Sequence, residues 1–281
     1  MISTYTHLNE TLEAVLRQKE ADGHENATRY RAYLKKLNVY RTTSSVNEYT
    51  VYGFLIAPRS LTKPAPVIIY NRGGSKDYGV IGKTTLCRDL LYVAYHGYVV
   101  LASQYTGNAG GGGTDELGGM DLEAVLELER DAEALAFCDE ERIGMLGESR
   151  GGIMTYMALT QSSRIKVALV NCASADLEHT YRMRPELRAY RADMYDTDSA
   201  IENKKRSVLH WPDHLPADVS LRIVQGTRDT HVPVEDIRRL CEILAEYSSV
   251  FQCTFYEDAH CLPNSRDAYQ AEVVRFFGEY L

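Results

Sequence analysis

The chain has 281 residues, of which 44% are hydrophobic, and its formal net charge is −8 at pH 7. This size fits one large globular domain with its own core. Charges of both signs are interspersed, which argues against nucleic acid as the main partner. No stretch approaches the roughly 20 apolar residues of a membrane span, and the N-terminus lacks the pattern of a secretory signal. We therefore expect a cytoplasmic protein with no membrane partner.

The first part of the chain predicts helices. Apolar residues recur at helical spacing in NETLEAVLRQKEADG and ATRYRAYLKKLNV, within residues 1–38. We predict an N-terminal helical extension over residues 1–45 and a main domain over residues 46–281. The extension would either pack on the core or mediate a homodimer.

Strand-like and helix-like segments alternate from residue 48 onward. EYTVYGFLIAPR alternates like a half-buried strand, and it is followed by the apolar runs PVIIY, YVVLA, IGML, VALV, LRIVQG and CTFYED. Helical patterns separate or follow them in TTLCRDLLYVAYHG, DLEAVLELERDAEALAF, VEDIRRLCEILAEY and DAYQAEVVRFFGEYL. This alternation predicts an α/β fold with a mostly parallel central sheet and helices on both faces.

Residues 175–219 interrupt the alternation and are too long for an ordinary loop. We predict a helical, cap-like insertion over the C-terminal edge of the sheet, where α/β folds place their ligands. Its tyrosines and arginines would either contact an acidic or polar substrate or form a solvated helix face; they are Tyr181, Arg182, Arg184, Arg188, Tyr190 and Arg191. Tyr181, Tyr190 and Arg188 are the candidates for a substrate pocket.

Three glycine-bearing stretches were compared with known motifs. GVIGKTT fails as a phosphate loop because Asp77 stands where the first glycine is required. GGGGTDELGG fails as a dinucleotide fingerprint because Asp115 or Glu116 stands at the third glycine. Residues 147–151, GESRG, fit G-x-S-x-G between a strand and a helix. In such an elbow the flanking glycines avoid collisions, and the following helix N-terminus favours a nearby oxyanion.

A nucleophilic Ser149 needs a base and an orienting carboxylate further along the chain. His260 is the candidate base, because it alone among the later histidines directly follows a strand-like run and precedes the final helix. Asp229, after the strand LRIVQG, is the preferred acid. Asp176 is its main competitor, and Asp258 lies so close to His260 in the chain that we expect it only to shape that loop.

Two backbone segments are candidates for an oxyanion hole. The N–H of Arg150, directly after the nucleophile, is the first donor. The second would come from the loop Arg72-Gly73-Gly74, through the main chain or the guanidinium. We expect no metal and no cofactor. The six cysteines are dispersed with no CxxC pair, so we expect buried free thiols, with Cys261 more reactive because it adjoins His260.

As a group, several segments resemble the catalytic domain of the prolyl oligopeptidase family of serine peptidases, which has the α/β-hydrolase fold. They are YNRGG, GYVVLASQYTGNAGGGGTDELGGMDLEAV, GESRGG, KKRSVLHWPDHLP, VQGTRDTHVPVE and EDAHCLP. The resemblance runs from about residue 48 to the C-terminus and implies a Ser149–Asp229–His260 triad that hydrolyses peptide bonds through an acyl-enzyme.

The chain departs from this family at three points. About 45 residues precede the hydrolase core, so we expect no β-propeller of the kind that gates substrates in the peptidases. Arg72 stands where many members have a tyrosine, and Thr106 stands where an arginine is usual. The leading hypothesis is a serine hydrolase that cleaves peptide or amide bonds of short substrates. A carboxylesterase acting on small acyl esters uses the same machinery and is the alternative. A non-catalytic binding module is a third hypothesis, because a fold does not fix a function.

Overall fold

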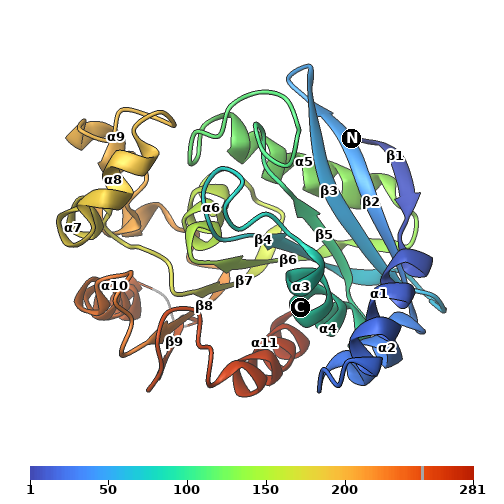
Figure 1. The fold of residues 1–281 in the computed structure, drawn as a ribbon. Coiled ribbons are helices and arrows are strands. Elements are labelled where there is room, and N and C mark those ends of the chain that lie inside the picture. Colours follow the sequence, from blue (N-terminus) through green and yellow to red (C-terminus); the bar gives the residue numbers. More distant parts are fainter. Residues whose placement is uncertain (248–249) are drawn as a thin grey trace.

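The computed structural model describes residues 1–247 and 250–281, and a nine-stranded sheet runs through them (Figure 1). The strands lie in the order β1-β2-β3-β5-β4-β6-β7-β8-β9. From β5 to β9 all pairings are parallel, whereas β1, β2 and β3 form an antiparallel edge that joins β5. The strand bounds are β1 (Ile2–His7), β2 (Leu37–Val46), β3 (Tyr49–Pro58), β4 (Ala65–Asn71), β5 (Val99–Ser103), β6 (Cys138–Glu148), β7 (Ile165–Asn171), β8 (Ser220–Gly226) and β9 (Gln252–Tyr256).

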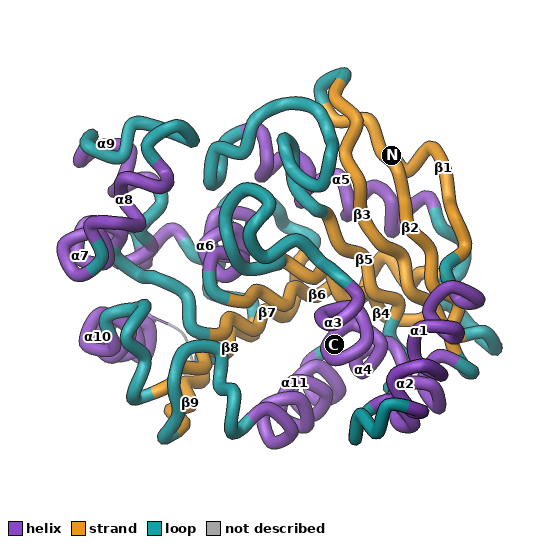
Figure 2. Tube along the Cα trace, in the orientation of Figure 1, coloured by secondary structure: helices purple, strands orange, loops and turns teal. Residues whose placement is uncertain are grey.

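Helices cover both faces of the sheet, as predicted (Figure 2). One buried apolar cluster joins the sheet to α5, α6 and α10, and a second joins the other face to α1, α2, α4 and α11. These helices are α1 (Asn9–Ala21), α2 (Ala27–Leu34), α3 (Lys83–Thr85), α4 (Leu91–Tyr95), α5 (Met120–Ala134), α6 (Arg150–Leu159), α10 (Val234–Tyr247) and α11 (Arg266–Tyr280), with a π-helical turn η1 (Leu86–Leu90) between α3 and α4. None of the described helices combines the length and apolar character that crossing a bilayer requires.

The N-terminal region differs in part from the prediction. The two expected helices are present as α1 and α2, but β1 and β2 flank them and belong to the sheet. Asn47 and Glu48 both have positive φ, and they connect β2 to β3 in a two-residue hairpin. The predicted helix extends through residues 35–38, whereas α2 ends at Leu34 and β2 begins at Leu37. The predicted boundary at residues 45 and 46 therefore falls beside this hairpin turn.

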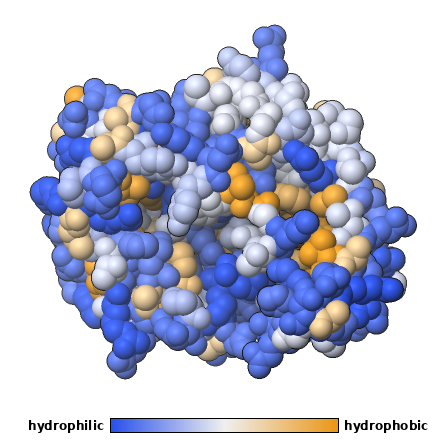
Figure 3. Space-filling model, in the orientation of Figure 1, coloured by the Kyte–Doolittle hydropathy of each residue, from blue (hydrophilic) through white to orange (hydrophobic). Residues whose placement is uncertain are grey.

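The insertion between β7 and β8 is helical, as predicted. It contains α7 (Leu177–Met183), α8 (Pro185–Arg191), α9 (Ala200–Lys205) and two 3-10 turns, η2 (Val208–His210) and η3 (Pro212–His214). A small apolar cluster packs the insertion against the main domain, and its buried members are Leu117, Ile153, Leu177, Tyr181 and Met194. Figure 3 shows mostly hydrophilic side chains over the insertion, at the left of the view, and apolar side chains gathered right of centre.

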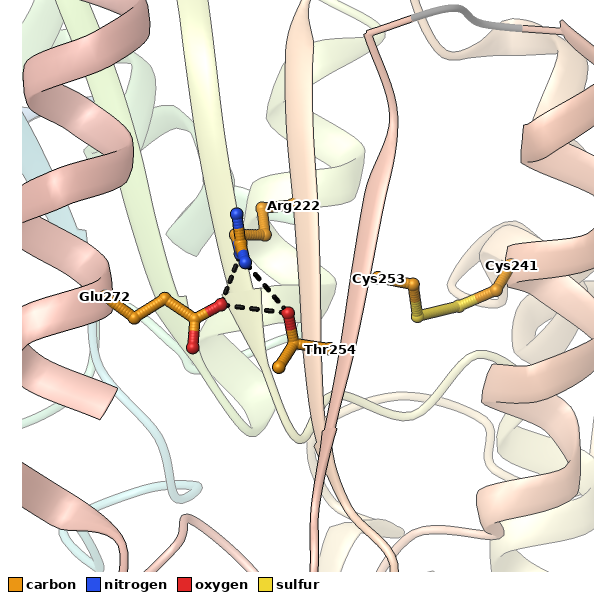
Figure 4. Close-up of a disulfide and its surroundings, with 5 residues drawn as sticks. All are labelled: Arg222, Cys241, Cys253, Thr254 and Glu272. Atoms are coloured by element: carbon orange, nitrogen blue, oxygen red, sulfur yellow. Dashed lines mark hydrogen bonds and ion pairs between the residues drawn. A yellow bond between two sulfur atoms is a disulfide. The ribbon is translucent and has the colours of Figure 1, made fainter. Parts of the chain in front are cut away.

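One expectation about the cysteines is wrong. Cys241 on α10 and Cys253 on β9 form a disulfide (Figure 4). The sequence gives no sign of this pair, because a separation of 12 residues becomes a contact only when α10 packs beside β9. The free cysteines are Cys87, Cys138, Cys172 and Cys261.

Beside the disulfide, a polar cluster joins β8, β9 and α11 (Figure 4). Arg222 donates a hydrogen bond to Glu272 and another, of 3.0 Å, to the hydroxyl of Thr254. Thr254 in turn donates to Glu272 over 2.9 Å. This cluster fixes the last strand against the final helix, and the candidate histidine lies on the loop between them.

Candidate active site

Ser149 lies at a sharp turn between β6 and α6. Its φ of 54° and ψ of −119° are strained for a residue with a side chain, as expected for a nucleophile elbow. The neighbouring glycines are required by space. A Cβ on Gly147 would lie 2.4 Å from the hydroxyl of Thr155, and one on Gly151 would lie 1.9 Å from the carbonyl oxygen of Asn71. The turn therefore lifts the serine hydroxyl at the C-terminal edge of the sheet.

The structure brings Ser149, His260 and Asp229 into one hydrogen-bonded chain. Nε2 of His260 lies 2.9 Å from Oγ of Ser149, and Nδ1 lies 2.8 Å from Oδ2 of Asp229. With the imidazole proton on Nδ1, this nitrogen donates to the carboxylate and leaves Nε2 free to accept from the serine hydroxyl. These three residues follow the C-terminal ends of β6, β9 and β8, which lie at one edge of the parallel part of the sheet, with β7 between β6 and β8.

The carboxylate of Asp229 is held in its charged form. It accepts hydrogen bonds from the backbone N–H groups of His231 and Val232, at 2.7 and 3.1 Å, and from the side chain of Gln225 at 2.9 Å. Burial acts to raise the pKa of Asp229, but the bond to His260 and these donors outweigh it and lower the pKa. Sequence reasoning missed Gln225, because its position inside β8 marks it only as a strand residue.

The two other acid candidates have structural roles. Asp176 caps α7, where its Oδ1 accepts from the N–H groups of Glu178 and His179. Asp258 shapes the loop that carries His260, as expected, because its carboxylate accepts from Ala259, Asn264 and Ser265.

The loop after β4 lies against the serine. A Cβ on Gly73 would come 3.3 Å from Cβ of Ser149, so the backbone of this loop approaches the nucleophile closely. The guanidinium of Arg72 is fully buried and donates to the carbonyl oxygens of Gly73, Lys76, Tyr78 and Gln104. The side chain is thus occupied in folding the loop. Only the main chain of this segment remains as the candidate oxyanion donor.

Arg150 is also buried, and its side chain ties the elbow to a distant loop. Its guanidinium bonds to Asp115, with one contact of 2.8 Å, to Asp121, and to the carbonyl oxygen of Gly74 at 3.2 Å. The centroid of the Tyr105 ring lies 4.4 Å from Cζ of this guanidinium. Sequence reasoning did not assign Asp115 or Asp121 to the site. A charged residue directly after the nucleophile was the available signal, since a buried guanidinium needs acidic partners.

A second polar network lies behind the elbow. Arg266 on α11 pairs with Glu148 at 2.8 Å and with Asp89 at 2.6 Å, and it donates to the carbonyl oxygen of Cys261 at 3.2 Å. One side chain therefore links the residue before Ser149 to the residue after His260. No motif in the sequence pointed to this link.

Comparison with known proteins gives the family. Residues 86–281 match the prolyl oligopeptidase family. A Bacillus subtilis protein named uncharacterized peptidase YtmA is 31% identical over 192 residues, which are 67% of this chain and 72% of that protein. This chain belongs to the prolyl oligopeptidase family. Membership identifies it as a serine hydrolase and disfavours a non-catalytic binding module.

Solved structures show the same fold. Pyrococcus horikoshii acylaminoacyl peptidase superposes with a TM-score of 0.75 at 21% identity, over 92% of this chain and 44% of that chain. A Mycobacterium tuberculosis puromycin-hydrolyzing peptidase gives a TM-score of 0.74 at 19% identity, over 89% of this chain and 40% of that chain. Pyrococcus furiosus esterase Pf2001 gives a TM-score of 0.67 at 16% identity, over 85% of this chain and 90% of that chain. This chain thus spans less than half of the two peptidases, and the described strands form one sheet with no propeller.

The predicted pocket residues of this family member lie in the insertion. Tyr181 is buried, and its hydroxyl bonds to that of Tyr195. Arg188 pairs with Glu178 on one side. Tyr190 contacts the loop after β4, because its hydroxyl donates to the carbonyl oxygen of Ser75 over 3.0 Å. The polar contacts of Tyr181 and Arg188 are internal to the insertion, so their assignment to a pocket stays a prediction.

Two cysteines lie beside the candidate site. The sulfur of Cys172 and one ligand atom each of Asp229 and His260 lie within 4.8 Å of one another, a set that could in principle hold a metal ion. Burial raises the pKa of Cys172 to about 12, so this side chain is a neutral thiol at neutral pH. Burial likewise raises the pKa of Cys261 well above its usual value, which disfavours the thiolate form, and the reactivity of this thiol stays a prediction.

Proposed function

We propose that this protein hydrolyses peptide or amide bonds of short substrates with Ser149, His260 and Asp229 as its catalytic triad. The continuous hydrogen-bonded chain from Oγ of Ser149 through His260 to Asp229, at 2.9 and 2.8 Å, carries this proposal. In the family the same order of serine, acid and histidine implies this chemistry.

The mechanism follows from the roles that the geometry allows. Nε2 of His260 takes the proton of Ser149 as the hydroxyl oxygen attacks the acyl carbonyl, and Asp229 stabilises the imidazolium that results. The backbone N–H groups of Arg150 and Gly73 would hold the oxyanion of the tetrahedral intermediate. His260 then gives the proton to the leaving group, an acyl-enzyme forms, and water releases the acyl group by the same steps.

The first prediction concerns the nucleophile. We expect Ser149→Ala to abolish covalent labelling by a fluorophosphonate probe and to lower kcat by about 10³-fold or more, with unchanged folding. Ser163→Ala, at an exposed serine, is the matched control and should label as the wild type does. Wild-type levels of labelling in Ser149→Ala, read by mass spectrometry of the labelled peptide, would contradict the assignment.

The alternative is a carboxylesterase. It needs the same residues and a less demanding leaving group, and the described residues hold no propeller that would select peptides by size. Turnover of aminoacyl 4-nitroanilides should be compared with turnover of short-chain 4-nitrophenyl esters. Ester turnover with no detectable amide turnover would replace the peptidase proposal with the esterase.

A further inference from the structure

Arg191, the last residue of α8, is a buried cation that forms no ion pair with a described carboxylate. Only 6% of its surface is exposed, and its Nε donates to Oγ of Ser75 over 3.1 Å. Its two terminal nitrogens bond to none of the described residues, and they are not among the fully enclosed polar atoms, so they face space open to solvent. A guanidinium in such a position presents two donor groups that have no partner within the described chain.

Two neighbouring arginines of the insertion, Arg184 and Arg188, differ from Arg191. Arg184 pairs with Glu186, and Arg188 pairs with Glu178 and Asp198. Arg191 has no ion pair with a described carboxylate. The acid nearest to it in the chain, Asp193, pairs instead with Lys76 at 2.6 Å. Because its terminal nitrogens keep access to solvent and have no partner among the described carboxylates, they are available to an anion from outside the chain.

Its place in the fold connects Arg191 to the candidate active site. Ser75 follows Gly73 by two residues, or at most about 7.6 Å between Cα atoms at 3.8 Å per step. Gly73 in turn lies against Ser149. Tyr190 also bonds to Ser75, so two side chains fix the end of α8 to the loop after β4. We call this loop, residues 72–75, the oxyanion loop because it carries the candidate oxyanion donor. Arg191 therefore lies within reach of a substrate whose carbonyl is at Ser149.

The position also decides which part of the substrate is involved. His260 must give its proton to the leaving group, so the leaving group lies on the side of the histidine. Arg191 is attached to the oxyanion loop rather than to the histidine loop. We propose that Arg191 binds a carboxylate on the acyl part of the substrate, such as an aspartate or glutamate side chain next to the scissile bond. This rests on the proposed function and adds a substrate class to it.

The chemistry fits a carboxylate well. A guanidinium binds a carboxylate through two parallel N–H···O bonds, and the free terminal nitrogens of Arg191 supply such donors. A neutral amide of the same shape offers one acceptor and no charge. The protein should therefore prefer an acidic acyl group over its amide by about tenfold or more in kcat/KM.

The test uses substrates that differ only in charge. The coumarin amides and the 4-nitrophenyl esters of N-acetylglutamate and N-acetylglutamine are compared on the full chain at low and physiological salt. The wild type should favour glutamate, Arg191→Gln should lose this preference through a higher KM, and Arg191→Lys should recover part of it. Lys205→Gln, which removes an exposed cation of the same insertion that is already paired with Glu202, should keep the wild-type ratio.

Each result decides the proposal. A wild type that favours glutamine or shows no preference overturns it without any variant, as does an Arg191→Gln variant that lowers both rates equally. If the variant fails to fold, the wild-type ratio and its decline with added salt still decide. Failure of the proposed function is a separate outcome, in which no substrate is turned over and Ser149 is not labelled by a fluorophosphonate.

Discussion

Two buried arginines beside the nucleophile balance their charges differently. Arg150 pairs with Asp115 and Asp121, whereas Arg72 bonds to carbonyl oxygens. Burial, and then the positive charge of Arg150, lower the pKa of Arg72 to about 10, so it still carries its proton at neutral pH. Position 72, where relatives often have a tyrosine, here supports the shape of the oxyanion loop through its side chain.

The pairing of Arg150 predicts a large effect on stability. Asp115→Ala leaves a buried guanidinium with one acidic partner, and it should lower the free energy of unfolding by about 3 kcal/mol. Asp198→Ala removes an exposed partner of Arg188 and should change the free energy of unfolding by less than about 1 kcal/mol. Urea denaturation of both variants checks this. Equal effects would show that the buried network adds no more than a surface pair.

Asp258 predicts a pH dependence. Burial acts to raise its pKa, but the hydrogen bonds of its loop lower the pKa from 3.8 to about 2. Because the pKa is lower in the folded state, the charged carboxylate stabilises the fold above about pH 4, and this stabilisation disappears as the pH falls through 2. Asp258→Asn should lower Tm at pH 7, and its difference from the wild type should shrink below pH 4. The exposed Asp218→Asn should show no such trend.

At the scale of elements, the elbow depends on close contact between α6 and β4. A Cβ at Gly151 would lie 1.9 Å from the carbonyl oxygen of Asn71, and backbone atoms there cannot yield without separating the two elements. Gly151→Ala should therefore destabilise the protein by about 3 kcal/mol or more and abolish labelling of Ser149.

Gly82→Ala is a control for this prediction. The nearest atom to its added Cβ would be 3.9 Å away, and its φ of −98° suits any residue. We expect a change of no more than about 1 kcal/mol in thermal or urea unfolding. A Gly151→Ala protein as stable as Gly82→Ala would mean that the elbow accommodates a side chain.

At the scale of the molecule, the N-terminal region completes the sheet and the core. β2 pairs with β3 along its whole length, and the helices α1 and α2 bury Leu12, Leu16 and Leu34 in the same cluster as the sheet. Removing residues 1–46 would expose this apolar surface and the edge of β3 together. We expect the shortened chain to aggregate or to bind a dye for exposed apolar surface, and to lose activity.

A soluble fragment of residues 47–281 with cooperative unfolding and the labelling of the full chain would show that the N-terminal region is an independent extension. Size-exclusion chromatography and thermal unfolding of both chains distinguish the two cases.

Local pattern was sufficient for most elements and for the candidate triad. The apolar runs from PVIIY to CTFYED predict the strands β4 to β9, and G-x-S-x-G with a strand before it predicts the elbow. Parallel strands bring their C-terminal ends to one edge, so the residues that follow them are neighbours whatever their separation in the chain. This is why His260 and Asp229 were found beside Ser149.

The sequence by itself thus determined the α/β class, the turn that carries Ser149 and the two partners of that serine, because each depends on short-range periodicity or on strand order. Only the tertiary structure decided that Asp115 and Asp121 pair with Arg150, that Cys241 bonds to Cys253 and that Arg191 bonds to Ser75 rather than to a described carboxylate. These facts depend on the directions in which side chains from distant loops point. No local pattern encodes them, since the same residues on a differently placed loop would lie in solvent.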